Sequence, residues 1–339
     1  MKKILTLFLI ISLLVSCTQA SVQKEYKGEI IDGANRTVKI PLNNNDISIA
    51  SVYAVSVPFI VALDLTDKVV AINAKSSFWY KANENLNNAG TVGRGNVDLE
   101  KLATYNPGVF IHRSNDPETV EAVEKLGIDV ICITVEDIDD VKNTLSMLGT
   151  YFDKEQKANE VKDWIDSKIE YIDEIVKAIP DNKKKTAMLL GGELGRVAGN
   201  DMLQTWMIEK AGGIPVIDEG ENHNWINIGV EKVFTYNPDV IFCTSSTSRN
   251  YQIDELITDS TWSAVNAIKN KNIFTIPAAN DSWDMPGISC VLGIMFMMHK
   301  MYPEYFSLEE LKKEVDEYYT FMFGRTFDEE LDIKWDEIR

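Results

Sequence analysis

Two segments of this 339-residue chain are nearly identical, and they constrain its fold more than any other feature. Residues 100–111 read EKLATYNPGVFI, and residues 231–242 read EKVFTYNPDVIF. Glu, Lys, Thr, Tyr, Asn, Pro and Val coincide in the two copies, and the other exchanges are mostly apolar. A match of this quality indicates one structural unit that is used twice, so we expect a chain with two similar halves.

Each copy predicts a short helix, a turn and a buried strand. The glutamates Glu100 and Glu231 stand in the first helical turn, where the helix dipole favours a negative charge. The Asn-Pro pair ends the helix, because proline disfavours the helical conformation in the residue before it. Taken alone, each glutamate is explained as a good first-turn residue, so the helix position by itself assigns it no function.

Strand and helix patterns alternate on both sides of one long amphipathic segment. Before it, the apolar runs VKIPL, DISIASV, KVVAIN, GVFIHR and DVICITV predict strands separated by helices, which is typical of a parallel α/β layer. Residues 153–178 carry apolar side chains at helical spacing with charges between them. After Pro180 a second α/β series begins at KTAMLL. The sequence therefore predicts two α/β lobes joined by one long helix.

The first residues predict export. Lys2 and Lys3 precede an apolar stretch, residues 4–15, that is too short and too early for an ordinary spanning helix. The stretch ends in LVSC, which resembles the lipobox of bacterial lipoproteins, so Cys17 is the expected lipid attachment site. Acyl chains would anchor the protein to the cell membrane on its extracytoplasmic side. A signal peptide that merely contains a cysteine is the alternative.

Composition limits the partners. The formal charge of −18 argues against a nucleic-acid partner, because no basic excess is present to neutralise phosphates, although a local basic pocket remains compatible with it. Cys132 and Cys243 lie in apolar runs and are expected to be buried free thiols. The expected organisation is a signal peptide (1–16), a tether (17–28), an N-terminal lobe (29–152), a linking helix (153–180), a C-terminal lobe (181–305) and a helical extension (306–339).

Several pieces of the chain together resemble the Fe/B12-type (class III) periplasmic binding proteins of ABC importers. They are VGRGNVDLEKL, EKLGIDVICI, GGELGRVAGNDMLQTWMIEKAGGIPV and WINIGVEKVFTYNPDVIF, spread over roughly residues 45–305. The resemblance implies two Rossmann-like lobes with a ligand cleft between them, no catalysis and no resident cofactor. It also implies a monomer that docks on a dimeric permease with its ATPase through one surface glutamate per lobe, here Glu100 and Glu231. Such exposed ion pairs set orientation and association rate.

In this family the position six residues before each docking glutamate often faces the cleft. Those positions are Arg94 and Trp225. Cobalamin binders of the family tend to have Trp at both, whereas hydroxamate-siderophore binders have Arg at the first. The Arg/Trp pair favours a ligand with anionic oxygens on one side and an apolar or planar face on the other. An Arg94 that merely pairs with a nearby acid is the alternative.

Further candidates follow predicted strands, where ligands of open α/β sheets bind. They are Trp79, Tyr80, His112, Arg113, Arg196, His223, Ser245, Ser246 and Trp283. His112 and His223 could ligate a metal or could be ordinary polar strand-end residues, and His299 is expected to be structural. With three histidines the chain is a poor match for a protein that binds bare zinc or manganese, which takes several such ligands.

The leading expectation is a binding protein for an iron–siderophore or a similar metal chelate. Cobalamin, haem or an oxyanion such as molybdate follow within the same family. An enzyme is the alternative from another class, in the form of a surface chelatase that uses His112 and His223. The chain has no phosphate loop, dinucleotide fingerprint or nucleophile elbow that would support other enzyme classes. A stiff joint made of one helix predicts modest lobe closure.

Overall fold

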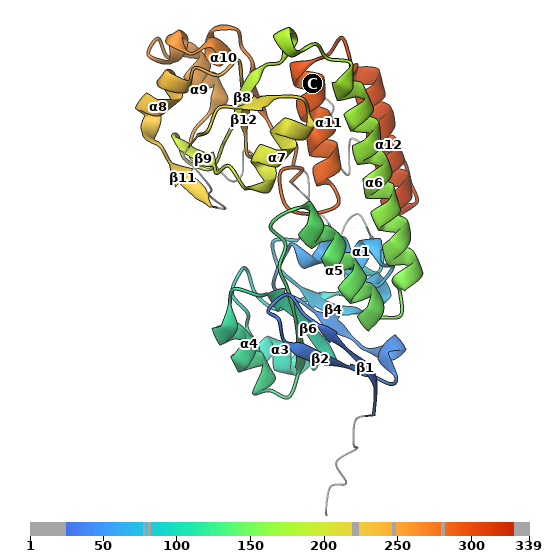
Figure 1. The fold of residues 1–339 in the computed structure, drawn as a ribbon. Helices are drawn as coiled ribbons and strands as arrows, with labels where there is room; N and C mark the ends of the chain where they lie inside the picture. The colour runs from blue at the N-terminus through green and yellow to red at the C-terminus, as the bar shows by residue number, and fades with distance from the viewer. Residues whose placement is uncertain are drawn as a thin grey trace, which may run out of the picture.

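The computed structural model describes residues 25–76, 79, 83–218, 224–245, 249–278 and 282–328. Two α/β lobes lie one above the other, and the long helix α6 (Glu155–Lys177) runs beside both of them (Figure 1). The predicted two-lobe fold is confirmed, and the linking helix lies within the predicted segment 153–178. Its buried side chains include Val161, Ile165 and Ile172, which the helical spacing placed on one face.

The N-terminal lobe is built on a parallel sheet with the strand order β5-β4-β3-β6-β7. The strands are β3 (Ile49–Ala50), β4 (Val69–Ile72), β5 (Gly90–Thr91), β6 (Val109–Arg113) and β7 (Asp129–Ile133). The helices are α1 (Ser56–Ala62), α3 (Leu99–Tyr105), α4 (Pro117–Glu124) and α5 (Ile138–Tyr151). Parallel strands need crossover helices, so α3 and α4 cover one face of the sheet, and α1 and α5 cover the other.

A separate antiparallel hairpin precedes this sheet. Its strands are β1 (Tyr26–Ile31) and β2 (Thr37–Pro41). Strand β1 therefore begins before residue 28, the predicted end of the tether. The Asp32 carboxylate explains this early start. It accepts hydrogen bonds from the turn nitrogen of Ala34 and from the nitrogen of Cys132 in β7, both at 3.0 Å. The hairpin is thereby tied to the sheet.

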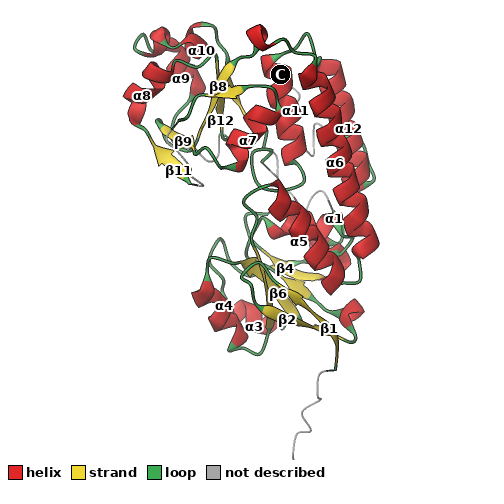
Figure 2. Ribbon diagram, viewed as in Figure 1, coloured by secondary structure: helices red, strands yellow, loops and turns green. Residues whose placement is uncertain are grey.

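The C-terminal lobe has a mixed sheet with the order β11-β9-β8-β12-β13, and β10 pairs with β8 (Figure 2). The strands are β8 (Thr186–Leu190), β9 (Arg196–Ala198), β10 (Ile214–Pro215), β11 (Trp225–Asn227), β12 (Val240–Cys243) and β13 (Ile273–Thr275). The helices are α7 (Leu203–Lys210), α8 (Gly229–Tyr236), α9 (Ile253–Thr258), α10 (Asn266–Lys269) and α11 (Cys290–Met301). The antiparallel pair β9 and β11 was not predicted from the sequence.

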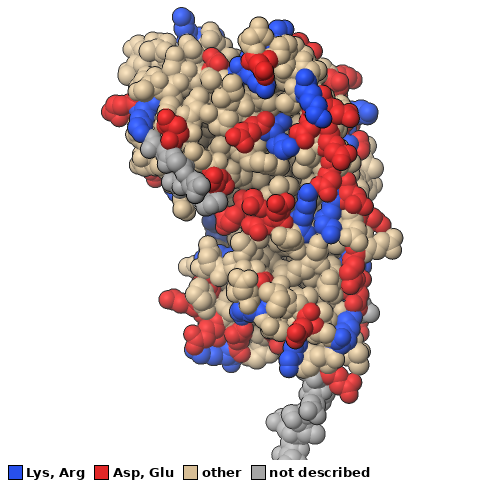
Figure 3. Space-filling model, in the orientation of Figure 1, with Lys and Arg blue, Asp and Glu red and all other residues tan. Residues whose placement is uncertain are grey.

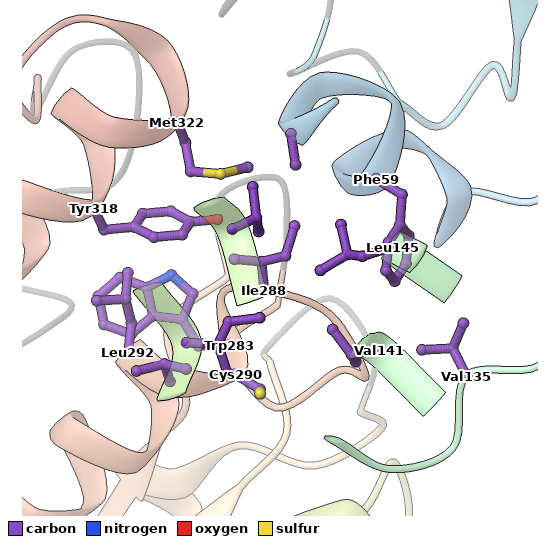
Figure 4. Close-up of a cluster of buried hydrophobic side chains, with 14 of the residues drawn as sticks. Phe59, Val135, Val141, Leu145, Trp283, Ile288, Cys290, Leu292, Tyr318 and Met322 are labelled. Atoms are coloured by element: carbon purple, nitrogen blue, oxygen red, sulfur yellow. The ribbon is translucent and has the colours of Figure 1, made fainter. Parts of the chain in front are cut away.

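One hydrophobic core continues from lobe to lobe behind the cleft. Figure 4 shows Phe59 of α1 and Leu145 of α5 near Trp283, Leu292 and Met322. Met322 belongs to the last helix, α12 (Leu308–Phe323). The three cysteines of the described part, Cys132, Cys243 and Cys290, are buried and form no disulfide within the described residues, as predicted for Cys132 and Cys243. Among the described residues, no helix is both long enough and apolar enough to cross a bilayer.

Candidate functional site

A cavity of about 170 Å³ lies between the two lobes, where the visible face of the molecule is hollowed (Figure 3). Its N-lobe wall consists of Tyr53, Val55, Val135 and Glu136, which follow β3 and β7. Its C-lobe wall consists of Asp201, Met202, Gln204, Trp225, Met285 and Pro286. On the N-lobe side this is the carboxyl edge of the sheet, the edge at which open α/β sheets bind ligands.

Tyr53 lines the cavity from the N-lobe. Its backbone is fixed by Ser51 and Ser56: the Tyr53 nitrogen donates to Ser51 Oγ at 3.1 Å, and its carbonyl accepts from the Ser56 nitrogen at 3.0 Å. Burial raises the pKa of Tyr53 to about 12, and the charge of Glu136 acts in the same direction while Arg113 opposes it. The phenol therefore stays protonated at neutral pH and can donate a hydrogen bond to an anionic ligand.

Arg113 and His112, both predicted site residues, end strand β6 and share one carboxylate. His112 Nε2 lies 3.0 Å from Asp116 Oδ2, and Arg113 Nη2 donates to the same oxygen at 2.9 Å. Burial disfavours the charged form of Asp116, but hydrogen bonds from His112, Arg113 and Thr119 outweigh it and hold the Asp116 pKa well below its usual range. The Arg113 guanidinium is nevertheless close enough to Tyr53 to act on its ionisation.

His112 is a weak candidate for a metal ligand in this arrangement. The side chain is 1% exposed, and burial lowers its pKa in spite of Asp116, so the ring is neutral. The Nε2 hydrogen is then used for Asp116, and only the partnerless Nδ1 is left. Within the described part of the chain, no group of three or more His, Cys, Asp or Glu side chains could hold a metal ion.

In the C-terminal lobe the structure brings together two predicted residues, Trp225 of the cavity wall and the exposed Arg196. They lie on the paired antiparallel strands β11 and β9, and the guanidinium carbon of Arg196 is 6.0 Å from the indole centroid. The indole packs directly on Gly191, where a Cβ atom would lie 2.7 Å from ring atom Cζ3. Glycine at this position therefore lets the indole reach the cavity wall.

The sequence interpretation missed Arg249. Its Nε and Nη1 atoms are buried and have no hydrogen-bond partner among the described residues, and the guanidinium carbon lies 5.5 Å from the Tyr251 ring centroid. The Tyr251 hydroxyl donates to the Gly191 carbonyl at 3.1 Å, so Arg249 is linked to Gly191 through Tyr251, whereas Trp225 packs on Gly191 directly. Arg249 as a whole is half-buried and also interacts with the Cys243 thiol, and its two unpaired N–H groups are available to bind an acceptor.

Two residues that do line the cavity were also missed, Tyr53 and Gln204. Gln204 is 4% exposed near the start of α7, and its Nε2 donates to the Asp284 carbonyl at 2.7 Å. Its Oε1 has no partner among the described residues. The sequence signal for Tyr53 and Arg249 was their place after a predicted strand, which selected His112 and Ser245 by the same rule. No such signal points to Gln204.

Trp79 and Trp283 require a correction, because the structure places them in the core instead of the cleft. Each side chain is 3% exposed. The Trp79 ring lies 5.8 Å from that of Phe323 at the end of α12, and Trp283 lies in the inter-lobe cluster of Figure 4. The expectation rested on aromatic residues in loops lacking a core to join. The last helix and the junction of the lobes supply that core.

The other residues named from the sequence either do not line the cavity or lie outside the described residues. Arg94 is exposed in a tight loop closed by a bridge between Gly93 and Val97, and it does not line the cavity. Ser245 is 6% exposed. His299 Nδ1 lies 3.0 Å from the Phe306 carbonyl, in keeping with a structural role. Four residues named from the sequence lie outside the described residues: Cys17, Tyr80, His223 and Ser246.

The two repeated segments have the same local structure. Glu100 lies in the first turn of α3 and Glu231 in the first turn of α8, and both are exposed. Each helix ends at an asparagine in the left-handed conformation, Asn106 and Asn237, with identical φ and ψ of 43° and 57°. Strands β6 and β12 follow. The structure therefore supports one unit per lobe with its glutamate at the surface.

Two α/β lobes, one linking helix and a cavity between the lobes define a class III periplasmic binding protein. The chain belongs to the periplasmic binding protein family, whose model matches residues 49–279. It is 24% identical to the molybdate-binding protein MolA of Haemophilus influenzae, covering 93% of this chain and 97% of MolA. It is 23% identical to YvrC, an uncharacterized ABC transporter substrate-binding lipoprotein of Bacillus subtilis, covering 87% and 94%.

Solved structures show the same fold. A periplasmic solute-binding protein of Veillonella parvula superposes with a TM-score of 0.74 at 22% identity, covering 91% of this chain and 97% of the other. MolA bound to molybdate gives a TM-score of 0.74 at 20% identity, covering 89% and 99%. The chain is therefore the substrate-binding protein of an ABC transporter, in a family whose members are extracytoplasmic and are not enzymes.

Proposed function

We propose that this protein captures a compact metal oxyanion of the molybdate type in the inter-lobe cavity and delivers it to a cognate permease. The observation that carries the proposal is the size of the cavity, about 170 Å³ between the described walls. Sites for drug-sized ligands usually occupy about 300–1,000 Å³. A tetrahedral oxyanion suits the smaller volume better than a siderophore, haem or corrinoid, which reverses the order expected from the sequence.

Three arginines near the cavity support an anion, although the residues that line it directly include the acidic Glu136 and Asp201. Arg113 acts on Tyr53 from the N-lobe, and Arg196 and Arg249 flank Trp225 and Gly191 in the C-lobe. Guanidinium groups bind oxyanions through paired N–H donors, and the protonated Tyr53 hydroxyl adds a further donor. The resemblance to MolA, whose solved complex contains molybdate, agrees with this choice.

An iron–siderophore complex is the second candidate. The observation that favours it is the exposed Arg94, for which the described residues provide no ion pair. A ligand that extends beyond the cavity toward this loop would use both Arg94 and Trp225, as the resemblance to siderophore binders implies. The two candidates make opposite demands on Arg94, which is dispensable for a small oxyanion and required for a siderophore.

Tryptophan fluorescence of the soluble Cys17→Ser protein separates the candidates, because Trp225 lines the cavity. We expect saturable quenching by molybdate and tungstate, and the same quenching in Arg94→Ala. Trp225→Phe should lose the quenching, although calorimetry should still measure its affinity for molybdate. Sulfate, a smaller tetrahedral anion of the same charge, serves as the control. Tight binding of a ferric siderophore, haem or cobalamin, with none of molybdate, would overturn the oxyanion proposal.

The lipid anchor and the docking role are also proposals. Cys17 is the proposed attachment site, and Glu100 and Glu231 are the proposed contacts with the two permease subunits. Support comes from the lipobox-like sequence before Cys17 and from the equivalent exposed positions of the two glutamates. Replacing Cys17 by serine should move the protein from the membrane fraction to the soluble fraction. Retention of the Cys17→Ser protein at the membrane would contradict the anchor.

A further inference from the structure

Helix α12 lies beside the linking helix α6 along the C-terminal lobe (Figures 1 and 2). Its first half belongs to the C-terminal lobe, where Leu311 and Val315 are buried in the core that contains α11. A capping box fixes its start: Ser307 Oγ accepts from the Glu310 nitrogen at 3.2 Å, and Glu310 Oε2 accepts from the Ser307 nitrogen at 2.7 Å. The helix is therefore anchored in one lobe.

A buried ion cluster fixes the register of α12 on α6. Lys168 Nζ donates to Glu314 Oε2 and to Glu317 Oε1, both at 2.7 Å, while Lys168 is 9% and Glu314 5% exposed. Burial disfavours the ammonium form, but the two carboxylates outweigh this and raise the Lys168 pKa. Sliding α12 by one turn would leave buried charges without partners, which is strongly unfavourable.

The far end of α12 contacts the N-terminal lobe. The Phe323 ring lies 5.8 Å from Trp79, which is itself 3% exposed. Val61 and Asp64 of the N-terminal lobe line a surface groove together with Met322 of α12. After the helix the chain folds back, and the Phe327 nitrogen donates a hydrogen bond to Asp316 Oδ1 at 3.1 Å. One helix thus belongs to one lobe by its start and touches the other by its end.

We propose that α12 is a second strut between the lobes, which holds the unliganded cleft close to its binding geometry. Helix α6 is a single element between the lobes, and α12 adds a second connection beside it. Any larger opening would also have to separate Phe323 from Trp79 or displace the Lys168 cluster from its buried position. The strut acts at the back of the molecule, so its effect does not depend on which ligand the front binds.

Pulsed EPR on the ligand-free protein tests the strut. Spin labels at Glu118→Cys in α4 and Lys269→Cys in α10, both exposed positions, report the separation of the lobes in a Cys17→Ser background. The buried native cysteines do not compete for the label. We expect Phe323→Ala to widen the distance distribution by about twofold, because the hinge loses one of its restraints. The matched control is Phe321→Ala, whose ring stacks on Trp164 of α6 at 5.4 Å.

The same measurement on Trp79→Ala approaches the contact from the other lobe. If the two rings act as one contact, this change reproduces the widening, and the double variant Trp79→Ala with Phe323→Ala widens the distribution no further. Circular dichroism and a cooperative thermal transition verify that each variant is folded. Unchanged widths in folded Phe323→Ala protein, or equal widening in Phe321→Ala, would overturn the proposal. So would additive widening in the double variant.

Discussion

The two copies of the repeated unit are alike up to their strands and different beyond them. In both, an exposed glutamate starts a helix, a left-handed asparagine ends it and a buried strand follows. After β6 the N-terminal lobe places Arg113 on Asp116, whereas after β12 the C-terminal lobe places Arg249 with no acidic partner among the described residues. The shared part suits a two-fold partner, and the divergent part forms an asymmetric site.

The helix starts also differ. Asp98 caps α3 by accepting from the Lys101 nitrogen at 3.1 Å, whereas α8 has no side-chain cap and begins at Gly229 with φ of 72°. Equivalent glutamate positions are thus reached by two local solutions. The glutamate therefore occupies the same position in both helices, although different residues support the two helix starts.

The largest expected effect concerns the shared part. Glu100→Ala combined with Glu231→Ala should lower ligand uptake by more than about tenfold and leave ligand affinity unchanged, because the two carboxylates would orient the protein on its permease. Uptake in cells and calorimetry with molybdate on the purified variant measure the two quantities. The two single variants, Glu100→Ala and Glu231→Ala, should show equal losses of uptake. A double variant with normal uptake would reduce the repeat to a scaffold.

The next effect concerns the divergent part. Arg249→Ala should weaken molybdate binding by about 10- to 100-fold, the size of a lost hydrogen bond to a charged group, and Arg249→Lys should recover part of it. Arg196→Ala should lose less, because Arg196 is exposed. Calorimetric titrations compare the three. If Arg196→Ala lost more affinity than Arg249→Ala, the Arg249 guanidinium would not be the main anion contact.

Stability measurements can separate the two left-handed asparagines. Asn106→Ala should lower the free energy of unfolding by about 1–2 kcal/mol, because alanine resists positive φ, and Asn106→Gly should be nearly neutral. Asn237→Gly should still lose stability, because the Asn237 Oδ1 atom accepts from the Asn266 nitrogen at 2.7 Å. Urea unfolding gives these values. Equal behaviour of the two glycine variants would contradict this distinction.

The smallest effect is a pH dependence confined to the N-terminal lobe. Asp116 has a lowered pKa in the folded protein, so its contribution to stability is present above its ordinary pKa of 3.8 and is lost as the pH falls further. Removing it by Asp116→Asn should cost on the order of 1 kcal/mol near pH 6, after allowance for solvent screening. The loss should shrink as the pH falls below 3.8 and should disappear only below the lowered pKa of Asp116 in the folded protein. A cost that persists in acid would assign Asp116 a role that does not involve its charge.

Much of the architecture was predictable because it depends on local patterns. Helix α6 followed from apolar spacing, and the repeat located both surface glutamates. Trp225 and Arg196 were found by family position and strand-end placement, and they do lie together. Trp79 and Trp283 were misplaced, because the core that buries them is formed by α12 and the lobe junction, which no local pattern reveals.

The sequence interpretation missed Arg249 for a related reason. A sequence shows that an arginine follows a strand, but it does not show whether an acidic side chain lies within reach. That depends on the fold around Gly191 and Tyr251, which brings no carboxylate to its buried nitrogens from the described residues. Tyr53 is similar, because its protonation state is set by burial and by Glu136 from a different strand end.

The three buried cysteines determine how a protein that is expected to work outside the cytoplasm responds to redox conditions. Cys132, Cys243 and Cys290 are enclosed by packed side chains, and none forms a disulfide. Burial raises the pKa of Cys132 to about 12 and that of Cys243 to about 11, so neither thiol is a ready nucleophile. The described fold therefore needs no oxidising folding machinery, and a change in the redox state of its surroundings would leave the shape of the cleft unaltered.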